Sequence, residues 1–400
     1  MEDFSPQSIN PVYSRISVTY IFFILGALSG NWITRIPDVK TKYALSKGTL
    51  GLVLAGVPLG AVLVMLVLGK LISTYGSKRM TMVGALMYHI TLPLILLMPN
   101  YILLWMFLMI VGVGATTCDI SMNSQGVETE RLLGTSIMSS LHAFFSIGGV
   151  VGSIMGGFFI ALNINPEIHL LIASLVFLPF TLLSFRFLRT EKLKPVYFKD
   201  NKRISNWQMF TNKEIWILGI IALIAVLAEL MMGDWSVLYL LAYNTNEANI
   251  AALGFATFSL FMTIGRLSGD AISNRIALDK IIQISSLIAS GGILIAIVTP
   301  SLIITLVGFA LLGLGLSIMV PIIFKIAGNN SNIEIGSGLA GVGLFMYLGG
   351  FIEPIFIGQI ADFSSLKVSF FIVAILILII FFFTKGLNNN NSTKLNLNSR

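Results

Sequence analysis

Charged side chains are scarce in this sequence of 400 residues. Asp, Glu, Lys and Arg make up only 11% of it, while 56% of the residues are hydrophobic. Soluble globular domains carry about 25% charged residues, so the composition excludes an ordinary soluble enzyme or binding domain. It predicts an all-α integral membrane protein that is embedded in the lipid bilayer.

Cysteine and histidine are scarce as well. A single cysteine, Cys118, excludes an internal disulfide and a zinc site built on two thiolates. The histidines His89, His142 and His169 lack the HExxH spacing of a zinc enzyme, and no Walker G-x-x-x-x-G-K-[ST] motif occurs. We therefore expect no enzyme activity, no metal and no cofactor, and energy from an ion gradient and not from ATP.

Positive charge is in excess, with a net charge of +7. In a soluble protein this would suggest nucleic-acid binding, but here Lys and Arg gather in loops. With the N-terminus inside, 20 lie on the cytoplasmic side and 5 outside. The positive-inside rule then predicts both termini and the central linker in the cytoplasm of a bacterial inner membrane, with no nucleic-acid partner. The first fourteen residues lack a basic n-region, so the first apolar run is expected to be retained as a helix.

Twelve apolar runs are long enough to cross a bilayer, for which about 20 residues suffice. They lie at 14–33, 48–69, 79–98, 101–123, 136–161, 167–187, 215–241, 249–269, 278–299, 302–325, 335–360 and 366–385. We expect an N-terminal six-helix bundle at 1–187, a basic cytoplasmic linker at 188–213, a C-terminal six-helix bundle at 214–387 and a disordered tail at 388–400.

The two halves of the sequence repeat each other at a nearly constant offset. Gly30-Asn31-Trp32 matches Gly233-Asp234-Trp235 at an offset of 203 residues. Glycine pairs in the fourth and fifth helices recur in the tenth and eleventh at an offset of 201 residues. An even number of helices in each half places the two repeats in parallel orientation, as in one class of secondary transporters.

The loop after the second helix carries Gly69, Leu71, Gly76, Lys78 and Arg79, and its counterpart in the second half carries Arg266 and Asp270. These residues resemble the G-x-L-x-D-R-x-G-R-R motif of the major facilitator superfamily of secondary transporters. The first loop departs from this motif at Ser73, Thr74 and Ser77, so the resemblance does not imply the usual ion pair of this loop. The resemblance implies two six-helix halves that move a solute by alternating access.

Other stretches resemble a bacterial branch of this superfamily that is loosely grouped with fucose and other sugar permeases. They are Trp32-x-x-Arg35-x-Pro37, Asp119-Ile-Ser-Met-Asn123 with Glu128, His142-Ala143-x-Phe145-Ser146, and Glu229 with Asp234-Trp235-Ser236. This resemblance implies a small polar, sugar-like solute.

Two acids in the seventh apolar run stand out because a carboxylate inside a bilayer is costly and must face protein or water. Glu229 lies near the middle of the run, and we take it as a proton-coupling candidate; the alternatives are a substrate-binding carboxylate and a protonated, hydrogen-bonded packing residue. Asp234 lies further out beside Trp235, and both are substrate-binding candidates or parts of an outer rim. Their repeat counterparts Asn31 and Trp32 are candidates of the same kind.

A third group of polar residues lies in the cytoplasmic part of the fourth and fifth helices. Asp119 and Asn123 stand four residues apart and so share a helix face. His142 is expected at a similar depth, and a histidine titrates close to neutral pH. Asp119 and His142 are proton-coupling candidates and Asn123 a substrate-binding candidate, unless the group is simply hydrated at the interface.

Glu353 is unusual because it precedes Pro354 in the middle of the eleventh helix. A proline bends a helix and frees a backbone carbonyl, which suits a gating element. Glu353 is a further proton-coupling candidate, or it pairs with Lys325. Two residues are expected to be structural: Arg35, at the surface, and His89, packed inside a bundle.

These observations predict a monomeric secondary transporter that moves a small polar solute together with protons, most simply by uptake. Proton-driven efflux of drugs or metabolites is the alternative, since intramembrane acids serve exporters equally well. A membrane sensor built on a transporter scaffold is the remaining alternative.

Overall fold

The computed structural model describes residues 10–135, 137–190, 212–273, 275–328 and 335–384. Every regular element within these ranges is a helix, and twelve helical segments there are long and apolar enough to cross a membrane. The predicted all-α membrane fold is therefore confirmed. Most of the predicted linker and the predicted C-terminal tail lie outside the described residues.

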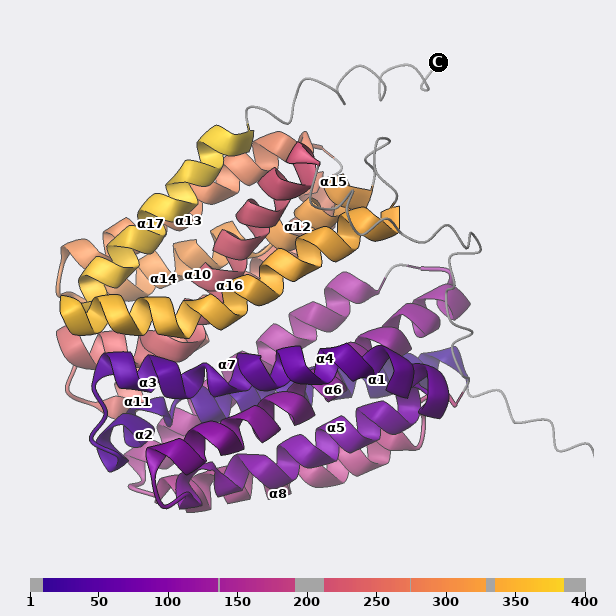
Figure 1. Cartoon of the computed structure of the whole chain (residues 1–400), viewed down its shortest axis with the longest axis horizontal. Coiled ribbons are helices and arrows are strands. Elements are labelled where there is room, and N and C mark those ends of the chain that lie inside the picture. Colours follow the sequence, from indigo (N-terminus) through magenta and orange to yellow (C-terminus); the bar gives the residue numbers. More distant parts are fainter. Residues whose placement is uncertain (1–9, 136, 191–211, 274, 329–334, 385–400) are drawn as a thin grey trace, which may run out of the picture. The chain divides into compact units, whose positions relative to one another are not determined.

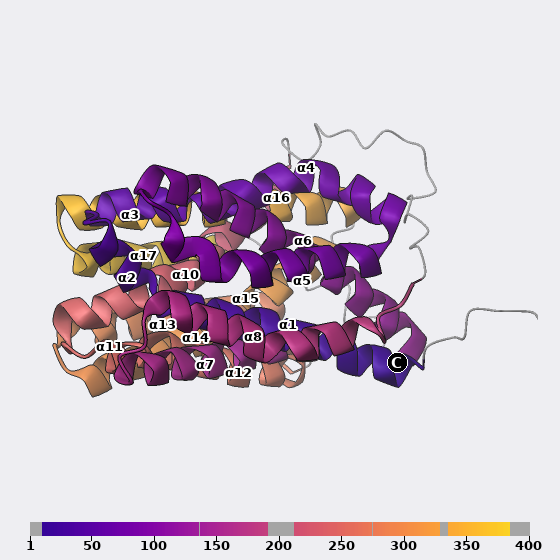
Figure 2. The same ribbon diagram turned by 90° about the horizontal axis from the view of Figure 1, so that it is seen from below.

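The helices follow one another along the chain as shown in Figures 1 and 2. Their bounds are α1 (Pro11–Ile33), α2 (Ile36–Lys42), α3 (Lys47–Leu54), α4 (Gly56–Tyr75), α5 (Ser77–Thr91), η1 (Leu92–Leu97), α6 (Tyr101–Leu133), α7 (Met138–Ala161), α8 (Pro166–Phe185), α10 (Lys213–Tyr243), α11 (Ala248–Ala251), α12 (Leu253–Ser273), α13 (Leu278–Val298), α14 (Leu302–Leu316), α15 (Met319–Gly328), α16 (Ile335–Phe363) and α17 (Leu366–Phe383).

The described residues form two compact units. The first unit contains α1 and α4 to α8, and the second contains α10 to α17. Residues 36–55, which carry α2 and α3, belong by their contacts to the second unit, although they precede α4 in the sequence. The reason is that α3 packs along α16 (Figure 1).

Polar residues fix several helix ends. Asn100 caps α6 by accepting hydrogen bonds from the N–H groups of Ile102 and Leu103, and Asn212 caps α10 in the same way. Helix α6 runs ten residues beyond its predicted end and stops at Gly134, whose φ of 64° is a left-handed conformation that favours glycine. The apolar stretch alone did not show this extension because the added turns are polar.

Proline interrupts two of the predicted spans. The second span divides at Ala55 into α3 and α4, three residues before Pro58, which has no N–H to donate to the carbonyl of Leu54. The third span changes from α-helix to 3₁₀-helix at Leu92, next to Pro93.

Glycines bring α1 and α7 into close contact in the first unit. A Cβ on Gly26 would overlap the carbonyl oxygen of Phe145, and a Cβ on Gly148 would overlap that of Phe23. The glycine run of the fifth predicted helix therefore serves close packing of helices, as small residues do in membranes.

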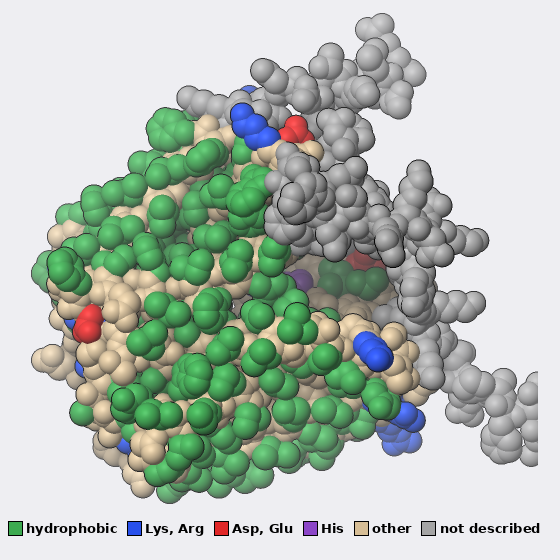
Figure 3. Space-filling view, in the orientation of Figure 1, with side chains coloured by type: hydrophobic (Ala, Val, Ile, Leu, Met, Phe, Trp, Pro, Cys, Tyr) green, Lys and Arg blue, Asp and Glu red, His purple; other side chains and the backbone are tan. Residues whose placement is uncertain are grey.

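Large apolar side chains cover much of the visible surface (Figure 3). Leu66, Phe158, Leu183 and Ile303 are each at least 60% exposed, which suits contact with lipid tails and would be unfavourable in water.

Candidate functional site

The strongest candidate site in the second unit is a pair of carboxyls on α10 and α16. Glu353 is fully buried, and Asp234 and Trp235 of α10 face its carboxyl group. Neither oxygen of Glu353 has a hydrogen-bond partner of good geometry among the described residues, nor does Nε1 of the fully buried Trp235. Buried polar atoms are nearly always paired with protein or ordered water, so a buried acid with two unpaired oxygens makes this pair the strongest candidate in the unit.

Local sequence explains why Glu353 lies here. Pro354 interrupts the hydrogen-bond pattern of α16 directly after Glu353. Upstream, a Cβ on Gly349 would lie 2.6 Å from the carbonyl oxygen of Leu223, so α16 packs closely on α10. Downstream, a Cβ on Gly358 would lie 3.2 Å from the ring of Trp235. The small residues Gly349 and Gly358 of α16 thus bring this helix close to α10, which carries Asp234.

Sequence reasoning suggested Lys325 as a partner for Glu353, and this pair does not form. Lys325 is exposed, whereas Glu353 is fully buried and its oxygens have no hydrogen-bond partner in the described part of the chain. Sequence reasoning named Asp234 as a candidate but did not place it beside Glu353, from which it is 119 positions away in the sequence.

Glu229 has a different environment from Glu353. One of its carboxylate oxygens accepts a hydrogen bond from Nη2 of Arg266 on α12 at 2.9 Å, and the side chains of Glu229 and Arg266 are 30% and 16% exposed. The sequence indicated both residues but assigned Arg266 to the second loop motif. The side chain of Asp270, from the same motif, lies outside the described part of the structure.

Helix α6 of the first unit brings two predicted residues together. Nδ2 of Asn123 donates to Oδ1 of Asp119 at 3.2 Å and to the Asp119 backbone carbonyl at 2.9 Å. His142 of α7 places its ring edge-on to Phe22, with ring centroids 5.2 Å apart. Asp119, Asn123 and His142 are all partly buried.

The outer candidates of the first unit form a buried chain of hydrogen bonds. Nε of Arg35 donates to Nδ1 of His169 at 2.8 Å, and Nε2 of His169 lies 2.6 Å from Oδ1 of Asn31. Because Arg35 can only donate, Nδ1 of His169 accepts and Nε2 carries the proton. Nδ2 of Asn31 donates to the carbonyl of Ala27. The amide of Asn31 is thus fully engaged inside the unit, while its neighbour Trp32 is 9% exposed.

The prediction of a surface position for Arg35 is wrong, since this residue is only 4% exposed. Its guanidinium reaches into the unit because His169 and the carbonyl of Ile164 accept its hydrogen bonds there. His89 is buried and lies 2.8 Å from the hydroxyl of Thr181, as expected of a packing residue.

The first loop motif is stabilised without its usual acid. Gly76 has φ of 88°, a left-handed value, and forms the N-cap of α5. Gly69 lies within α4 with no atom near its missing Cβ. Lys78 is partly buried and Arg79 is exposed.

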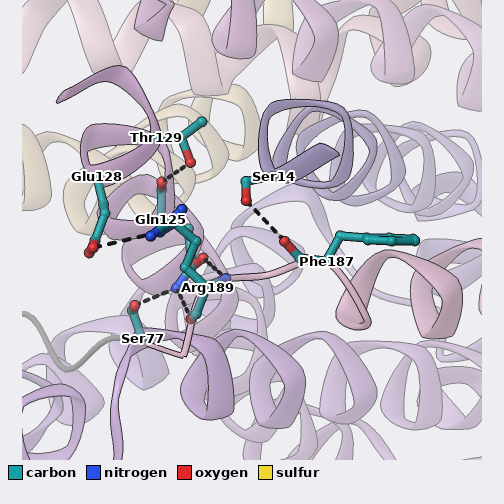
Figure 4. A network of polar contacts seen from close by, with 7 residues as sticks. All are labelled: Ser14, Ser77, Gln125, Glu128, Thr129, Phe187 and Arg189. Atoms are coloured by element: carbon teal, nitrogen blue, oxygen red, sulfur yellow. Dashed lines mark hydrogen bonds and ion pairs between the residues drawn. The ribbon is translucent and has the colours of Figure 1, made fainter. Parts of the chain in front are cut away.

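A polar network anchors the residues around this loop (Figure 4). Nε2 of Gln125 donates to Oγ of Ser77 at 2.6 Å and to the carbonyl of Arg189 at 3.0 Å, and its Oε1 accepts from the N–H of Arg189 at 2.9 Å. Glu128 lies 3.9 Å from Nε of Arg189. Sequence reasoning missed Gln125 because an uncharged amide in a long helix carries no distinctive pattern.

Comparison with known proteins agrees with this architecture. Residues 16–331 match the family model described as Major Facilitator Superfamily. An uncharacterized MFS-type transporter of Yersinia pestis is 30% identical over 372 residues, which cover 92% of this chain and 94% of the relative. Membrane protein MosC of Rhizobium meliloti is 31% identical over 360 residues, covering 90% and 86%.

Two solved structures have the same fold. A mutant of the nucleoside transporter NupG superposes with a TM-score of 0.77 at 13% identity, covering 94% of this chain and all of the other. A variant of the fucose:proton symporter FucP of E. coli superposes with a TM-score of 0.65 at 17% identity, covering 94% and 98%.

Proposed function

This chain belongs to the Major Facilitator Superfamily of transporters, and on that premise we propose that it takes up a small polar, sugar-like solute together with protons. The solute crosses by alternating access, with Glu353 and Asp234 as the pair that binds the proton. Inner-membrane location with both termini in the cytoplasm, and action as a monomer, are part of this proposal.

The observation that carries the proposal is the unpaired, fully buried carboxyl of Glu353 next to Asp234. Two ionised carboxyls side by side and away from water would lose their hydration and repel each other. One proton bound by the pair removes both costs. The pair therefore suits a step in which a proton enters with the solute and leaves on the other side.

Glu229 is less suited to this role than the sequence alone suggested. Its charge is balanced by Arg266 at 2.9 Å, so proton binding at Glu229 would leave a partly buried guanidinium without its carboxylate. We propose that the Glu229 and Arg266 pair holds α10 against α12, and that Glu353 carries the coupling proton.

The solute class rests on the resemblance to sugar permeases and on fold neighbours named as a nucleoside and a fucose transporter. Both names point to polar, hydroxyl-bearing solutes. Asn123 and Trp235 remain our candidates for solute contacts, while the amide of Asn31 is already occupied by His169 and Ala27.

The test begins with a thermal-shift screen of the purified protein against sugars, nucleosides, amino acids and drugs. The best ligand is then used in proteoliposomes, where an inward proton gradient should drive its accumulation. Glu353→Gln should abolish accumulation while leaving exchange of labelled for unlabelled solute intact, since exchange needs no net proton movement.

Matched variants sharpen this result. Glu247→Gln changes an exposed acid in the same unit and should behave as wild type. Glu229→Gln should reduce stability but keep coupling. Wild-type accumulation that ignores both the proton gradient and the membrane potential would exclude the coupling proposal, and accumulation driven by an outward gradient would show efflux.

A further inference from the structure

We propose that Trp235 is a positioning residue of the proton site, whose indole N–H holds the carboxylate of Glu353 once the proton has left. The inference rests on the proposed function in taking Asp234 and Glu353 as the pair that binds the proton. It concerns only the N–H of Trp235, so the face of the indole ring remains a candidate for contact with the solute.

The side chains of Trp235 and Glu353 supply the two halves of a hydrogen bond. Both are fully buried, and the helices that carry them, α10 and α16, pack along each other (Figure 1). Nε1 of Trp235 and both oxygens of Glu353 lack a partner of good geometry within the described ranges, and Nε1 faces the carboxyl group. A tryptophan offers one donor and no acceptor, whereas an ionised carboxylate only accepts. Ionised Glu353 therefore completes the pairing of both groups.

Close packing fixes the direction of this N–H. The indole ring lies against the backbone of α16, where a Cβ on Gly358 would be 3.2 Å from Cη2 of Trp235. Gly358 is between one and two turns beyond Glu353 on the same helix. Cη2 belongs to the six-membered half of the indole and Nε1 to the other half. The ring thus touches α16 at one end while its N–H faces Glu353 at the other, which leaves little room for the indole to turn.

Asp234 and Trp235 act on opposite protonation states of Glu353. A protonated Glu353 can donate its O–H to the carboxylate of Asp234, and Trp235 cannot take over this role because it has no acceptor. When the proton leaves, the charge of Asp234 repels the new carboxylate, while the N–H of Trp235 binds it. Asp234 therefore favours proton binding and Trp235 favours proton release, which makes the site reversible.

No other charged side chain on the helices packed against α16 interacts with the carboxyl of Glu353 in the described part of the chain. The response of Glu353 to pH is therefore set by two neighbouring residues of α10. The other charged side chains of these helices are placed as follows: Glu229 pairs with Arg266, Lys47 donates to the carbonyl of Ala361, Lys367 lies over the ring of Tyr243, Asp362 accepts from Ser46, Lys325 is exposed, and Lys213 and Glu214 begin α10.

Infrared spectroscopy of the purified full chain in lipid bilayers tests this proposal without a known solute. The carbonyl stretch of protonated carboxyls is followed as the pH is raised, and the band that Glu353→Gln removes belongs to Glu353. In Trp235→Phe this band should persist to a pH about one unit higher, because the ionised form has lost one hydrogen bond to a charged group.

Trp216→Phe is the matched control. It makes the same replacement on the same helix, at a side chain that is 42% exposed. The Glu353 band of this variant should disappear at the same pH as in the wild type. A purely structural effect of losing a tryptophan would lower Tm without moving this pH.

A second measurement does not depend on the folding of Trp235→Phe. The five tryptophans of the unaltered chain are isotopically labelled at the indole nitrogen and followed by nuclear magnetic resonance. One indole N–H signal should shift with the same pH midpoint as the infrared band, and this shift should be absent in Glu353→Gln.

The outcomes separate this inference from the proposed function. A Glu353 band that never disappears, or that disappears at the same pH in the wild type and in Trp235→Phe, would overturn the role of Trp235. An equal displacement in Trp216→Phe, or indole signals that do not follow the protonation of Glu353, would do the same. If the midpoint moves as expected while solute uptake ignores the proton gradient, the role of Trp235 stands and only the proposed coupling fails.

Discussion

The buried chain of Arg35, His169 and Asn31 gives a quantitative prediction about stability. His169→Phe keeps an aromatic ring against Phe159, whose centroid is 4.7 Å from that of His169, but removes both hydrogen bonds. Nε of Arg35 and Oδ1 of Asn31 then lose their partners inside the unit. Each buried polar group that loses its hydrogen-bond partner destabilises the folded protein by about 1–3 kcal/mol. With two such groups, the free energy of unfolding should fall by roughly 2–6 kcal/mol.

The assay is the midpoint of thermal unfolding, Tm, of the purified protein in detergent. A Tm shift of about 2–4 °C for each kcal/mol is typical of units of this size, so a loss near 3 kcal/mol lowers Tm by roughly 6–12 °C. Adding Asn31→Leu to His169→Phe should recover part of the loss, because the buried acceptor disappears with its donor.

His89→Phe is the control for this measurement. It removes one hydrogen bond, to Thr181, whose hydroxyl still donates to the carbonyl of Phe177 at 3.1 Å. Its effect should be less than half that of His169→Phe. Equal effects, or a His169→Phe protein within about 2 °C of wild type, would show that the chain of hydrogen bonds does not stabilise the unit in the way its geometry requires.

Two further predictions concern single elements. Gly76→Ala forces a side chain onto a backbone with φ of 88° and ψ of 150°. This strain costs about 1–3 kcal/mol, so Tm should fall by several degrees. Gly69→Ala is the control: it lies inside α4 with open space around it and should leave Tm unchanged or raise it slightly. Glu229→Arg alone and Arg266→Glu alone should each lower Tm. The double variant restores an ion pair with the charges exchanged and should recover at least half of the lost stability. No recovery of Tm would mean that the 2.9 Å pair does not hold α10 to α12.

The fold could be predicted from the sequence because each membrane span carries its own signal. An apolar run of bilayer length must form a helix to satisfy its backbone, whatever its neighbours are. The predicted ends were wrong where polar turns extend a helix, as in α6 up to Gly134. They were also wrong where a proline divides a span, as at Ala55.

The candidate residues could be named from the sequence, but not their partners. Isolated polar residues in apolar runs stand out, and this is how Glu229, Asp234 and Glu353 were found. Which acid meets a base and which meets another acid depends on helix rotation and packing, so Glu229 with Arg266 and Glu353 with Asp234 emerged only from the structure. The same reason explains why Arg35 was placed at the surface while it reaches His169 inside the unit.

The way in which Gln125 holds residue 189 has a consequence for sequence variation. Gln125 forms two hydrogen bonds with the backbone N–H and carbonyl of Arg189, and these do not depend on the identity of the side chain at position 189. Any amino acid except proline, which lacks the N–H, can occupy position 189 and keep both bonds. Position 125, in contrast, needs one donor and one acceptor at a fixed separation, which a side-chain amide supplies. These two bonds therefore require an amide at position 125, whereas the side chain at position 189 answers to its other contacts, such as the one with Glu128 at 3.9 Å.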